Sequence, residues 1–319
     1  MRQEKRKPLI ILTGPTAVGK TKLSIALAKA VNGEIISADS MQVYKEMNIG
    51  TAKITKEEMQ GVPHYLVDEF SPEEEFNVVK FKEYALKYME EIYAKGKIPI
   101  IVGGTGFYIQ ALLYDVKFDP SEEDNHTYRG ELEELAASKG ATYLHEMLRE
   151  IDPKSAEAIH ANNVKRVIRA IEFFHQNGYP ISEHNEEQRQ NESPYNYAYF
   201  VLNDDRDILY QRIDARVDLM VEQGLVAEVQ KLYDEGYDLS LVSMQGLGYK
   251  EIINYFEGEI CLEEAIYRIK RDTRHFAKRQ ITWFKREREV IWVNRQEFAN
   301  EEDTILNYML QQLSEKDII

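Results

Sequence analysis

The sequence predicts an α/β protein in which a mostly parallel sheet is flanked by helices and interrupted by an inserted all-helical domain. Short apolar runs that are typical of buried strands recur along the chain, and stretches with helical spacing separate most of them. From residue 119 to residue 195 the strand pattern gives way to charged helices. We therefore assign residues 1–118 and 196–319 to the core, and residues 119–195 to an insertion that acts as a lid or substrate domain.

The individual elements follow from local patterns. The predicted strands are residues 9–12, 34–40, 65–68, 98–102, 197–202 and 290–293, and amphipathic helices are predicted at residues 78–93 and near the C-terminus. The first strand leads directly into a glycine-containing segment and then into a helical pattern. Strands that alternate with helices in this way favour parallel pairing, because each crossover returns the chain to the same edge of the sheet.

Composition limits the classes of function. The 319 residues include 40 basic and 55 acidic side chains, which give a net charge of −15. Such a chain does not bind nucleic acid by bulk attraction, although a local basic stripe could. Cys261 is the only cysteine, which excludes a disulfide framework within the chain, and no Cys/His cluster has zinc spacing. The apolar run after the basic start is too short for a signal sequence or a membrane span, so we expect a cytoplasmic protein.

The segment at residues 14–21 fits the pattern G-x-x-x-x-G-K-S/T between a predicted strand and a predicted helix. Backbone amides and the helix N-terminus there point to one place, and Lys20 adds a positive charge. We predict that this loop binds a phosphate or diphosphate group through Gly14, Pro15, Thr16, Ala17, Val18, Gly19, Lys20 and Thr21. The alternative is a glycine-containing turn that binds nothing.

Other candidate site residues follow predicted strands. Asp39 would emerge beside the phosphate-binding loop, since ligands bind at the carboxyl ends of parallel strands; alternatively it caps the next helix. Asp68 could order a magnesium ion, as in an NTPase. Three glycines and the hydroxyls of Thr105 and Tyr108 follow the strand at residues 98–102, where they form either a ligand-binding turn or a plain tight turn.

Several basic residues have two interpretations. Arg212 and Arg216 lie four residues apart and either clamp a phosphate together or pair with nearby acidic residues. Lys165 and Arg166 in the insertion fit a solvated helix face by default. Residues 268–288 contain nine basic side chains against two acidic ones, which indicates a track for a polyanion. The aromatic residues interleaved with them either pack in the core or stack on bases.

These stretches together resemble the tRNA dimethylallyltransferases, the bacterial tRNA isopentenyltransferase family. The resemblance covers nearly the whole chain and rests on residues 14–21, 39–44, 103–106, 245–251 and 274–284. The chain departs from the family pattern at Val18, where Ser is usual, at Lys285, where Arg is common, and at Asn163, where Asp is frequent. The first two changes remove neither a backbone phosphate donor nor a charge.

The resemblance implies a reaction and a set of residues. A dimethylallyl group passes from dimethylallyl diphosphate to N6 of adenosine 37, next to the tRNA anticodon, while the insertion grips the anticodon stem-loop. Asp39 acts as general base, Arg216 stabilises the leaving diphosphate, Thr16 contributes to catalysis and Thr21 lies near Mg²⁺. The implied tRNA-binding residues are Asp39, Ser40, Met41, Gln42, Thr105, Arg129, Lys165, Arg166, Gln245, Gly246, Gly248, Tyr249, Lys278, Arg279 and Gln280.

We expect a monomeric enzyme, and two alternatives stay open from the sequence. A P-loop kinase of small metabolites would use the same phosphate-binding loop and a helical lid with arginines, but it leaves the basic residues at 268–288 unexplained. A non-catalytic RNA-binding module would hold nucleotide only as a structural ligand, and Asp39 and Arg216 would then be dispensable.

Overall fold

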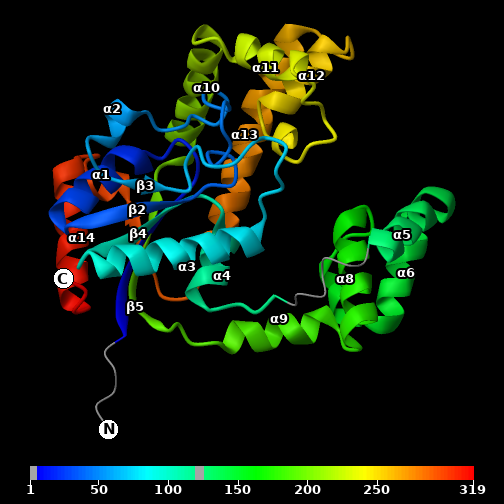
Figure 1. Ribbon diagram of the computed structural model, residues 1–319, viewed down its shortest axis with the longest axis horizontal. Coiled ribbons are helices and arrows are strands. Elements are labelled where there is room, and N and C mark those ends of the chain that lie inside the picture. Colours follow the sequence, from blue (N-terminus) through cyan, green and yellow to red (C-terminus); the bar gives the residue numbers. More distant parts are fainter. Residues whose placement is uncertain (1–5, 119–125) are drawn as a thin grey trace. The chain divides into compact units, whose positions relative to one another are not determined.

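The computed structural model describes residues 6–118 and 126–319. The basic start of the chain, up to residue 5, and the predicted start of the insertion at residue 119 therefore lie outside the described residues. It divides into two compact units (Figure 1). One unit comprises Met1–Leu113 and Pro194–Ile319, and the other comprises Tyr114–Ser193. The second unit is the helical segment that the sequence analysis bounds at residues 119–195.

The first unit contains a six-stranded parallel sheet with the order β3-β2-β4-β1-β5-β6. The strands are β1 (Lys7–Thr13), β2 (Gly33–Ala38), β3 (His64–Tyr65), β4 (Ile98–Gly103), β5 (Tyr195–Asn203) and β6 (Val290–Asn294). The predicted parallel sheet flanked by helices is therefore confirmed. The prediction of a strand through residue 68 is wrong, because Leu66 and Asp68 have φ angles of 58° and 61°, where a strand cannot continue.

Helices cover both faces of this sheet (Figure 1). Alternate strand residues such as Ile10, Leu12 and Ile35 join one core cluster with α1 (Lys20–Ala30) and α14 (Glu302–Glu315). The opposite face packs against α3 (Val78–Ala94), which is followed in the chain by β4 and then α4 (Gly106–Leu113). Because side chains alternate between the faces of a strand, these fully buried strands are apolar almost throughout.

The local sequence explains how α3 begins and which face it buries. The Asn77 side chain accepts hydrogen bonds from the Val79 and Lys80 amides at 3.0 and 3.1 Å, which satisfies two backbone donors at the helix start. Phe81, Ala85, Met89 and Ile92 are buried at helical spacing. The cap and this stripe together direct the chain into β4, whose carboxyl end carries part of the candidate site.

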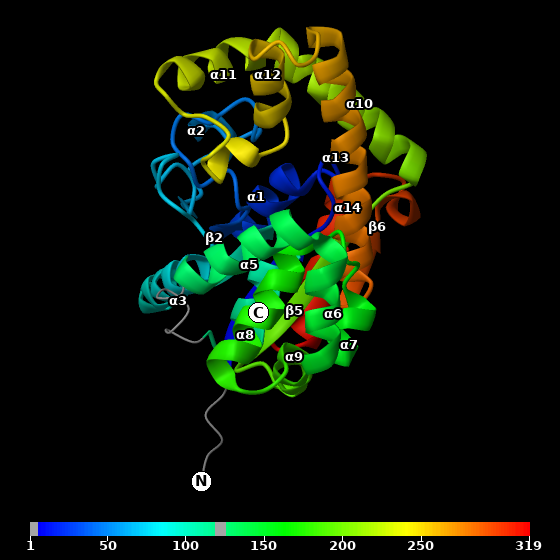
Figure 2. The ribbon, with the colours of Figure 1, turned by 90° about the vertical axis from the view of Figure 1, so that its right-hand side faces the viewer.

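Four helices extend from the carboxyl side of the sheet (Figures 1 and 2). They are α10 (Arg206–Glu222), α11 (Leu225–Asp234), α12 (Tyr249–Phe256) and α13 (Leu262–Phe284). The long helices α10 and α13 run side by side, and α11 and α12 lie at one end of them. The short elements of this unit are α2 (Lys56–Met59), η2 (Ser243–Gln245) and η3 (Arg295–Phe298).

The second unit has its own core and contains helices only among its described residues. They are α5 (His126–Lys139), α6 (Ala141–Ile151), α7 (Pro153–Ala158), α8 (Val164–Asn177) and α9 (Ile181–Gln190). Leu132, Leu144, Leu148, Val167 and Ile171 form its centre. In the described parts of both units, every helix is too short or too polar to cross a membrane.

Candidate active site

The phosphate-binding loop joins β1 to α1. Gly14 and Gly19 have φ angles of 145° and 96°, which glycine adopts without the strain of a side chain. A Cβ atom on Gly14 would also collide with the Leu202 carbonyl of β5. Lys20 begins α1 and folds back over the loop, where its Nζ donates to the Gly14 and Pro15 carbonyls at 2.9 and 2.8 Å. The loop therefore has the form that the sequence predicts, and its lysine lies within it.

Three charged groups influence one another at this edge of the sheet. Burial lowers the pKa of Lys20 to about 8; the Asp39 carboxylate opposes this shift and Arg216 reinforces it. Burial also lowers the pKa of Arg216, again against the effect of Asp39. Lys20 comes from α1, Asp39 follows β2 and Arg216 lies on α10. The structure thus brings together two half-buried cations and the carboxylate predicted to be the base.

The Asp39 carboxylate organises the turn that follows β2. Its Oδ1 accepts hydrogen bonds from the Met41 amide at 2.9 Å and the Gln42 amide at 3.3 Å. The alternative that Asp39 caps a helix is wrong as stated, because residues 40–42 form a turn and no helix begins there. The capping geometry is nevertheless present. It fixes the carboxylate through Oδ1 and leaves Oδ2 outside these two bonds.

The second glycine-rich turn lies directly beside Asp39. A Cβ atom on Gly103 would collide with the Ala38 backbone, and the Thr105 amide donates to the Ala38 carbonyl at 3.1 Å. Thr13, the last residue of β1, donates through its hydroxyl to the Gly103 carbonyl at 2.6 Å. The turn is therefore held against β1 and β2. Gly103 is required for close packing against the Ala38 backbone, and Gly104 and Gly106 leave room for the side chains of Gln280 and Trp283 on α13.

Gln280 on α13 bridges the two glycine-containing loops. Its Oε1 accepts from the Thr16 amide at 2.9 Å, and its Nε2 donates to the Gly104 carbonyl at 3.0 Å. The residue is 6% exposed, and a Cβ atom on Gly104 would occupy the position of its amide nitrogen. The family resemblance implies that Gln280 binds tRNA. In the structure, both ends of its carboxamide contact the protein's own backbone.

The structure separates the two arginines that the sequence leaves equivalent. Arg212 Nη1 donates to Asp204 Oδ2 at 2.7 Å, and the Asp204 side chain is fully buried at the end of β5. Across residues 6–118 and 126–319, Arg216 forms no comparable ion pair, and Asp39 has the largest effect of any charged group on its pKa. Arg212 therefore takes the pairing interpretation, and the role of Arg216 as a phosphate clamp stays a prediction.

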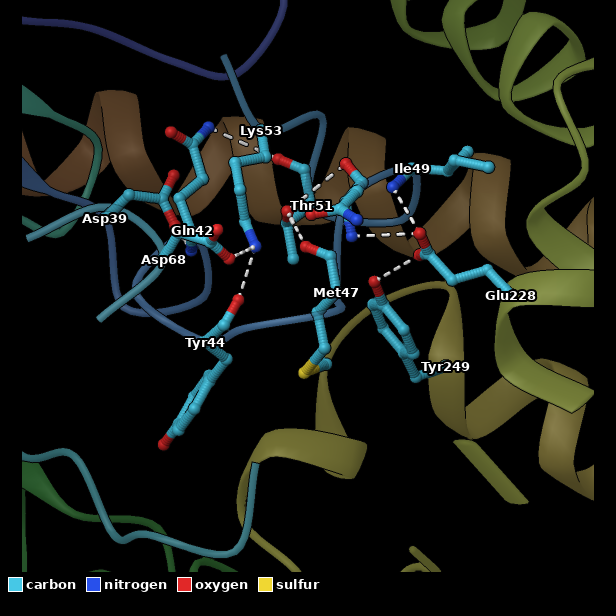
Figure 3. Close-up of polar contacts among 11 residues, drawn as sticks. Asp39, Gln42, Tyr44, Met47, Ile49, Thr51, Lys53, Asp68, Glu228 and Tyr249 are labelled. Carbon is cyan, nitrogen blue, oxygen red and sulfur yellow. Dashed lines mark hydrogen bonds and ion pairs between the residues drawn. The ribbon is translucent and has the colours of Figure 1, made fainter. Parts of the chain in front are cut away.

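Asp68 does not match a magnesium ligand of an NTPase. The Nζ atom of Lys53 lies 2.8 Å from Asp68 Oδ1 and also donates to the Tyr44 carbonyl at 2.5 Å (Figure 3). Nor do the described residues contain a group of three or more His, Cys, Asp or Glu side chains that could hold a metal ion. A metal at this edge would depend on one protein oxygen, such as the Thr21 hydroxyl in the first turn of α1, together with oxygens of a ligand.

The glycine-containing motif at residues 245–251 is brought to the segment that follows Asp39. A Cβ atom on Gly246 would collide with the Met41 side chain, so these two residues lie in direct contact. Gly248 has a φ angle of 98° and precedes α12, where Tyr249 is fully buried. Gln245 is exposed, and its Nε2 donates to the Leu239 carbonyl. The motif is therefore a helix junction that supports the residues after β2.

The predicted polyanion track on α13 is divided in two. Arg268, Lys270, Arg271 and Arg274 pair with Glu264, Asp218, Asp272 and Asp214, respectively. The sequence count of two opposing acidic residues was too low, because α10 contributes further ones. The exposed basic side chains lie toward the other end, at Lys278, Arg279, Lys285 and Arg286. Of the interleaved aromatic residues, Phe284 is fully buried, as expected for core packing.

In the second unit, the predicted RNA-binding residues differ in their surroundings. Arg129 forms two hydrogen bonds with Glu172, at 3.0 and 2.7 Å, so its guanidinium holds α5 to α8. Lys165 and Arg166 are exposed in the first turn of α8. A structural role is thus visible for Arg129, whereas the other two present positive charge to solvent.

One residue at this edge gave no signal in the sequence. Glu228 on α11 accepts hydrogen bonds from three consecutive amides of residues 48–50 and from the Tyr249 hydroxyl (Figure 3). It lies in a chain segment with several other acidic side chains, and nothing in the pattern distinguishes it from them. Only Gly50, against which the Tyr249 ring packs, could have drawn attention to this loop.

These features define the class of the protein, an α/β protein of the phosphate-binding-loop type with an all-helical insertion. Residues 42–287 match the family model described as IPP transferase. The chain is 67% identical to a tRNA dimethylallyltransferase of Lachnoclostridium phytofermentans, with 98% of this chain and 99% of that protein covered. The chain therefore belongs to the IPP transferase family.

Solved structures agree with this assignment. A tRNA isopentenylpyrophosphate transferase from Bacillus halodurans is 45% identical, with a TM-score of 0.71 and 98% of both chains covered. A eukaryotic dimethylallyltransferase acting on tRNA is 30% identical, with a TM-score of 0.81, and the match covers 98% of this chain and 79% of that one. The match extends over almost the whole of this chain in each case.

Proposed function

We propose that the protein is a tRNA dimethylallyltransferase, which transfers a dimethylallyl group from dimethylallyl diphosphate to N6 of adenosine 37. The observation that carries this proposal is the meeting of Lys20, Arg216 and Asp39 at the carboxyl edge of the sheet. Two half-buried cations and a phosphate-binding loop suit a diphosphate. A carboxylate beside them suits a proton acceptor, and the names of the relatives support the proposed reaction.

In the proposed reaction, the N6 lone pair of adenine attacks C1 of the dimethylallyl group. The C1–oxygen bond breaks, its electron pair leaves with the diphosphate, and the N6 proton passes to Asp39 Oδ2. Because Oδ1 accepts the Met41 and Gln42 amides, the carboxylate is held for this transfer. Lys20, Arg216 and the loop amides, including that of Thr21, stabilise the charge that develops on the leaving group.

Mg²⁺ fits the site as part of this proposal. Mg²⁺ in phosphate sites commonly uses one or two protein oxygens and completes its shell with phosphate oxygens and water. The exposed Thr21 hydroxyl at the start of α1 offers one such oxygen beside Lys20. When bound there with the diphosphate, the ion would neutralise charge on the leaving group.

The RNA would approach the same edge of the sheet. The target adenosine must leave its stack to reach Asp39, which costs a few kcal/mol and least in a single-stranded loop. Ser40, Gln42 and Thr105 lie beside Asp39 in the chain or across the turn, and Lys278 and Arg279 flank Gln280 on α13. Lys165 and Arg166 on the separate helical unit would contact the anticodon stem-loop. As part of the same proposal, the protein acts as a cytoplasmic monomer.

One incubation tests the proposed function. The protein is mixed with unmodified tRNA, Mg²⁺ and labelled dimethylallyl diphosphate, with and without ATP. Label that enters tRNA without ATP supports the proposal, whereas protein that folds, binds pyrophosphate and transfers no label refutes it. Hydrolysis of ATP without entry of label into tRNA would instead support the kinase alternative.

The role of Asp39 is tested by Asp39→Asn, which keeps an Oδ1 acceptor for the Met41 and Gln42 amides. We expect this variant to keep its tRNA affinity and to lose about 10²- to 10⁴-fold in the rate of a single turnover, because it lacks the proton acceptor. The comparison uses saturating concentrations of both substrates, so that binding does not limit the rate. A single-turnover rate equal to that of the wild type would exclude Asp39 as the base.

A further inference from the structure

Glu228 lies outside the residues of the proposed chemistry, yet it holds a loop beside them (Figure 3). Its Oε2 accepts from the Asn48 and Ile49 amides at 2.9 and 2.7 Å. Its Oε1 accepts from the Gly50 amide at 3.0 Å and from the Tyr249 hydroxyl at 2.7 Å. One carboxylate on α11 thus binds three consecutive backbone donors and one donor from α12.

The loop requires an anion at this point. Successive backbone N–H groups that point the same way form a concave site with partial positive charge, and a carboxylate has two oxygens to receive them. A glutamine would supply only one oxygen and would turn its NH₂ group toward amide donors. The Tyr249 ring closes the site, since a Cβ atom on Gly50 would lie within 2.8 Å of three of its atoms. Burial and the Glu228 carboxylate raise the pKa of Tyr249, so its hydroxyl stays a donor.

The same loop is held on its other side by Gln42. The Nε2 atom of Gln42 donates to the Thr51 and Ala52 carbonyls at 3.3 and 3.2 Å. The backbone N–H of Gln42 donates to Asp39 Oδ1. Because both side-chain partners are carbonyls, which only accept, the nitrogen of this carboxamide must face the loop. The orientation of Gln42, and with it the turn at Asp39, therefore depends on where residues 48–52 lie.

We propose that Glu228 is a positioning residue for the RNA substrate. Glu228 fixes residues 48–52, and these residues orient the Gln42 side chain. Gln42 then presents its Oε1 acceptor to the extruded adenosine, together with the backbone turn that follows Asp39. This inference rests on the proposed function. It assigns Glu228 no contact with dimethylallyl diphosphate, because Lys20, Gln280 and the phosphate-binding loop are held by other residues.

The test compares Glu228→Gln with Glu235→Gln, a matched change at an exposed glutamate at the end of the same helix, whose nearest cation is Lys231 at 3.8 Å. In Glu228→Gln, we expect faster hydrogen–deuterium exchange confined to residues 47–53, since their amides lose the carboxylate. The KM for tRNA should rise about tenfold, the effect of losing roughly one charge-assisted hydrogen bond. The KM for dimethylallyl diphosphate and the affinity for pyrophosphate should not change. Glu235→Gln should match the wild type.

A purely structural role is distinguished by Gln42→Met and the double variant. If Glu228 acts through Gln42, the KM for tRNA in the double variant rises by less than the product of the two single-variant rises. If the two residues act independently, it rises by that product. Any one of three results would overturn the inference: unchanged exchange at residues 47–53, an equal rise of KM for both substrates, or a KM for tRNA in the double variant that equals the product of the single-variant effects. Tyr249→Phe removes one donor and keeps the carboxylate, and it decides the question if Glu228→Gln does not fold. A wild-type protein without transfer activity would refute the proposed function, whereas the exchange result reports on the loop alone.

Discussion

Replacing Gln280 with methionine should loosen the phosphate-binding loop from α13. The carboxamide is 6% exposed and joins the Thr16 amide to the Gly104 carbonyl. Methionine has a similar length and volume, so the change removes two hydrogen bonds without opening a large cavity. The variant therefore isolates the polar bridge between the two glycine-containing loops.

The expected magnitude follows from the two backbone groups that lose their partner. Leaving a buried donor or acceptor unsatisfied costs about 1–3 kcal/mol, so the free energy of unfolding should fall by about 2–6 kcal/mol. Water that enters the site would bring the loss toward the lower value. The pyrophosphate affinity should fall about tenfold, because the loop must be ordered again on binding. The variant Gln280→Glu keeps an acceptor for the Thr16 amide, but it sets a carboxylate against the Gly104 carbonyl and should weaken pyrophosphate binding through repulsion.

The assays are denaturant unfolding and calorimetric titration with pyrophosphate. Thr282→Val is the matched control on the same helix, because the Thr282 hydroxyl is exposed and bonds the Lys278 carbonyl of its own helix at 2.9 Å. We expect the control to bind pyrophosphate like the wild type. If Gln280→Met has the midpoint and the pyrophosphate affinity of the wild type, the bridge contributes nothing and the reasoning fails.

Two further predictions concern the cations of the site. With a pKa of about 8, half of Lys20 is uncharged at pH 8 in the free protein. A bound diphosphate favours the ammonium form, so binding should take up about half a proton from Lys20 at pH 8 and weaken as the pH rises through 8. Calorimetry in buffers of different ionisation enthalpy measures this uptake, with Lys20→Arg as the permanently charged reference; equal uptake in both proteins would contradict it. Arg216→Met should weaken pyrophosphate binding about 10²-fold with little loss of stability. Arg212→Met should remove one partner of the buried Asp204 carboxylate, which keeps the Asp205 amide at 2.9 Å and Arg295 at 4.0 Å, and should cost about 1–3 kcal/mol of unfolding free energy. If Arg212→Met instead lost pyrophosphate affinity and Arg216→Met lost stability, the roles given to the two arginines would be wrong.

Much of the fold could be predicted from the sequence because the buried parallel strands are short, continuous apolar runs. β1, β4 and β6 differ from their predicted ranges only at their ends. The error at β3 arose because the apolar character of residues 65–67 resembles a strand, while the backbone turns at Leu66 through a positive φ. Neither Leu66 nor Asp68 is a glycine, so the residue type gave no indication of that turn.

The candidate site could be predicted only where its residues lie in compact motifs. The phosphate-binding loop and the turn after Asp39 are such motifs, and their local geometry follows from spacing. Arg212 and Arg216 lie in the same run of acidic residues in the sequence, and only the fold shows that Asp204 reaches the first of them. Gln280 and Glu228 act on backbone groups far away in the sequence. A backbone amide or carbonyl has no residue identity, so no pattern of side chains could indicate these contacts.

The distribution of acidic residues explains how an acidic chain can keep a site for the two polyanionic substrates of the proposed function. On the first part of α13, acidic residues of α10 and of the helix itself pair with the basic side chains and so remove their charge from the surface field. Basic residues stay exposed near Gln280, and Arg216 is half-buried and forms no close ion pair among the described residues. The net charge of −15 then opposes nonspecific RNA binding, while the local excess of positive charge lies beside the phosphate-binding loop. Selectivity for RNA that reaches this edge would follow from where the acidic residues are placed as much as from the basic residues themselves.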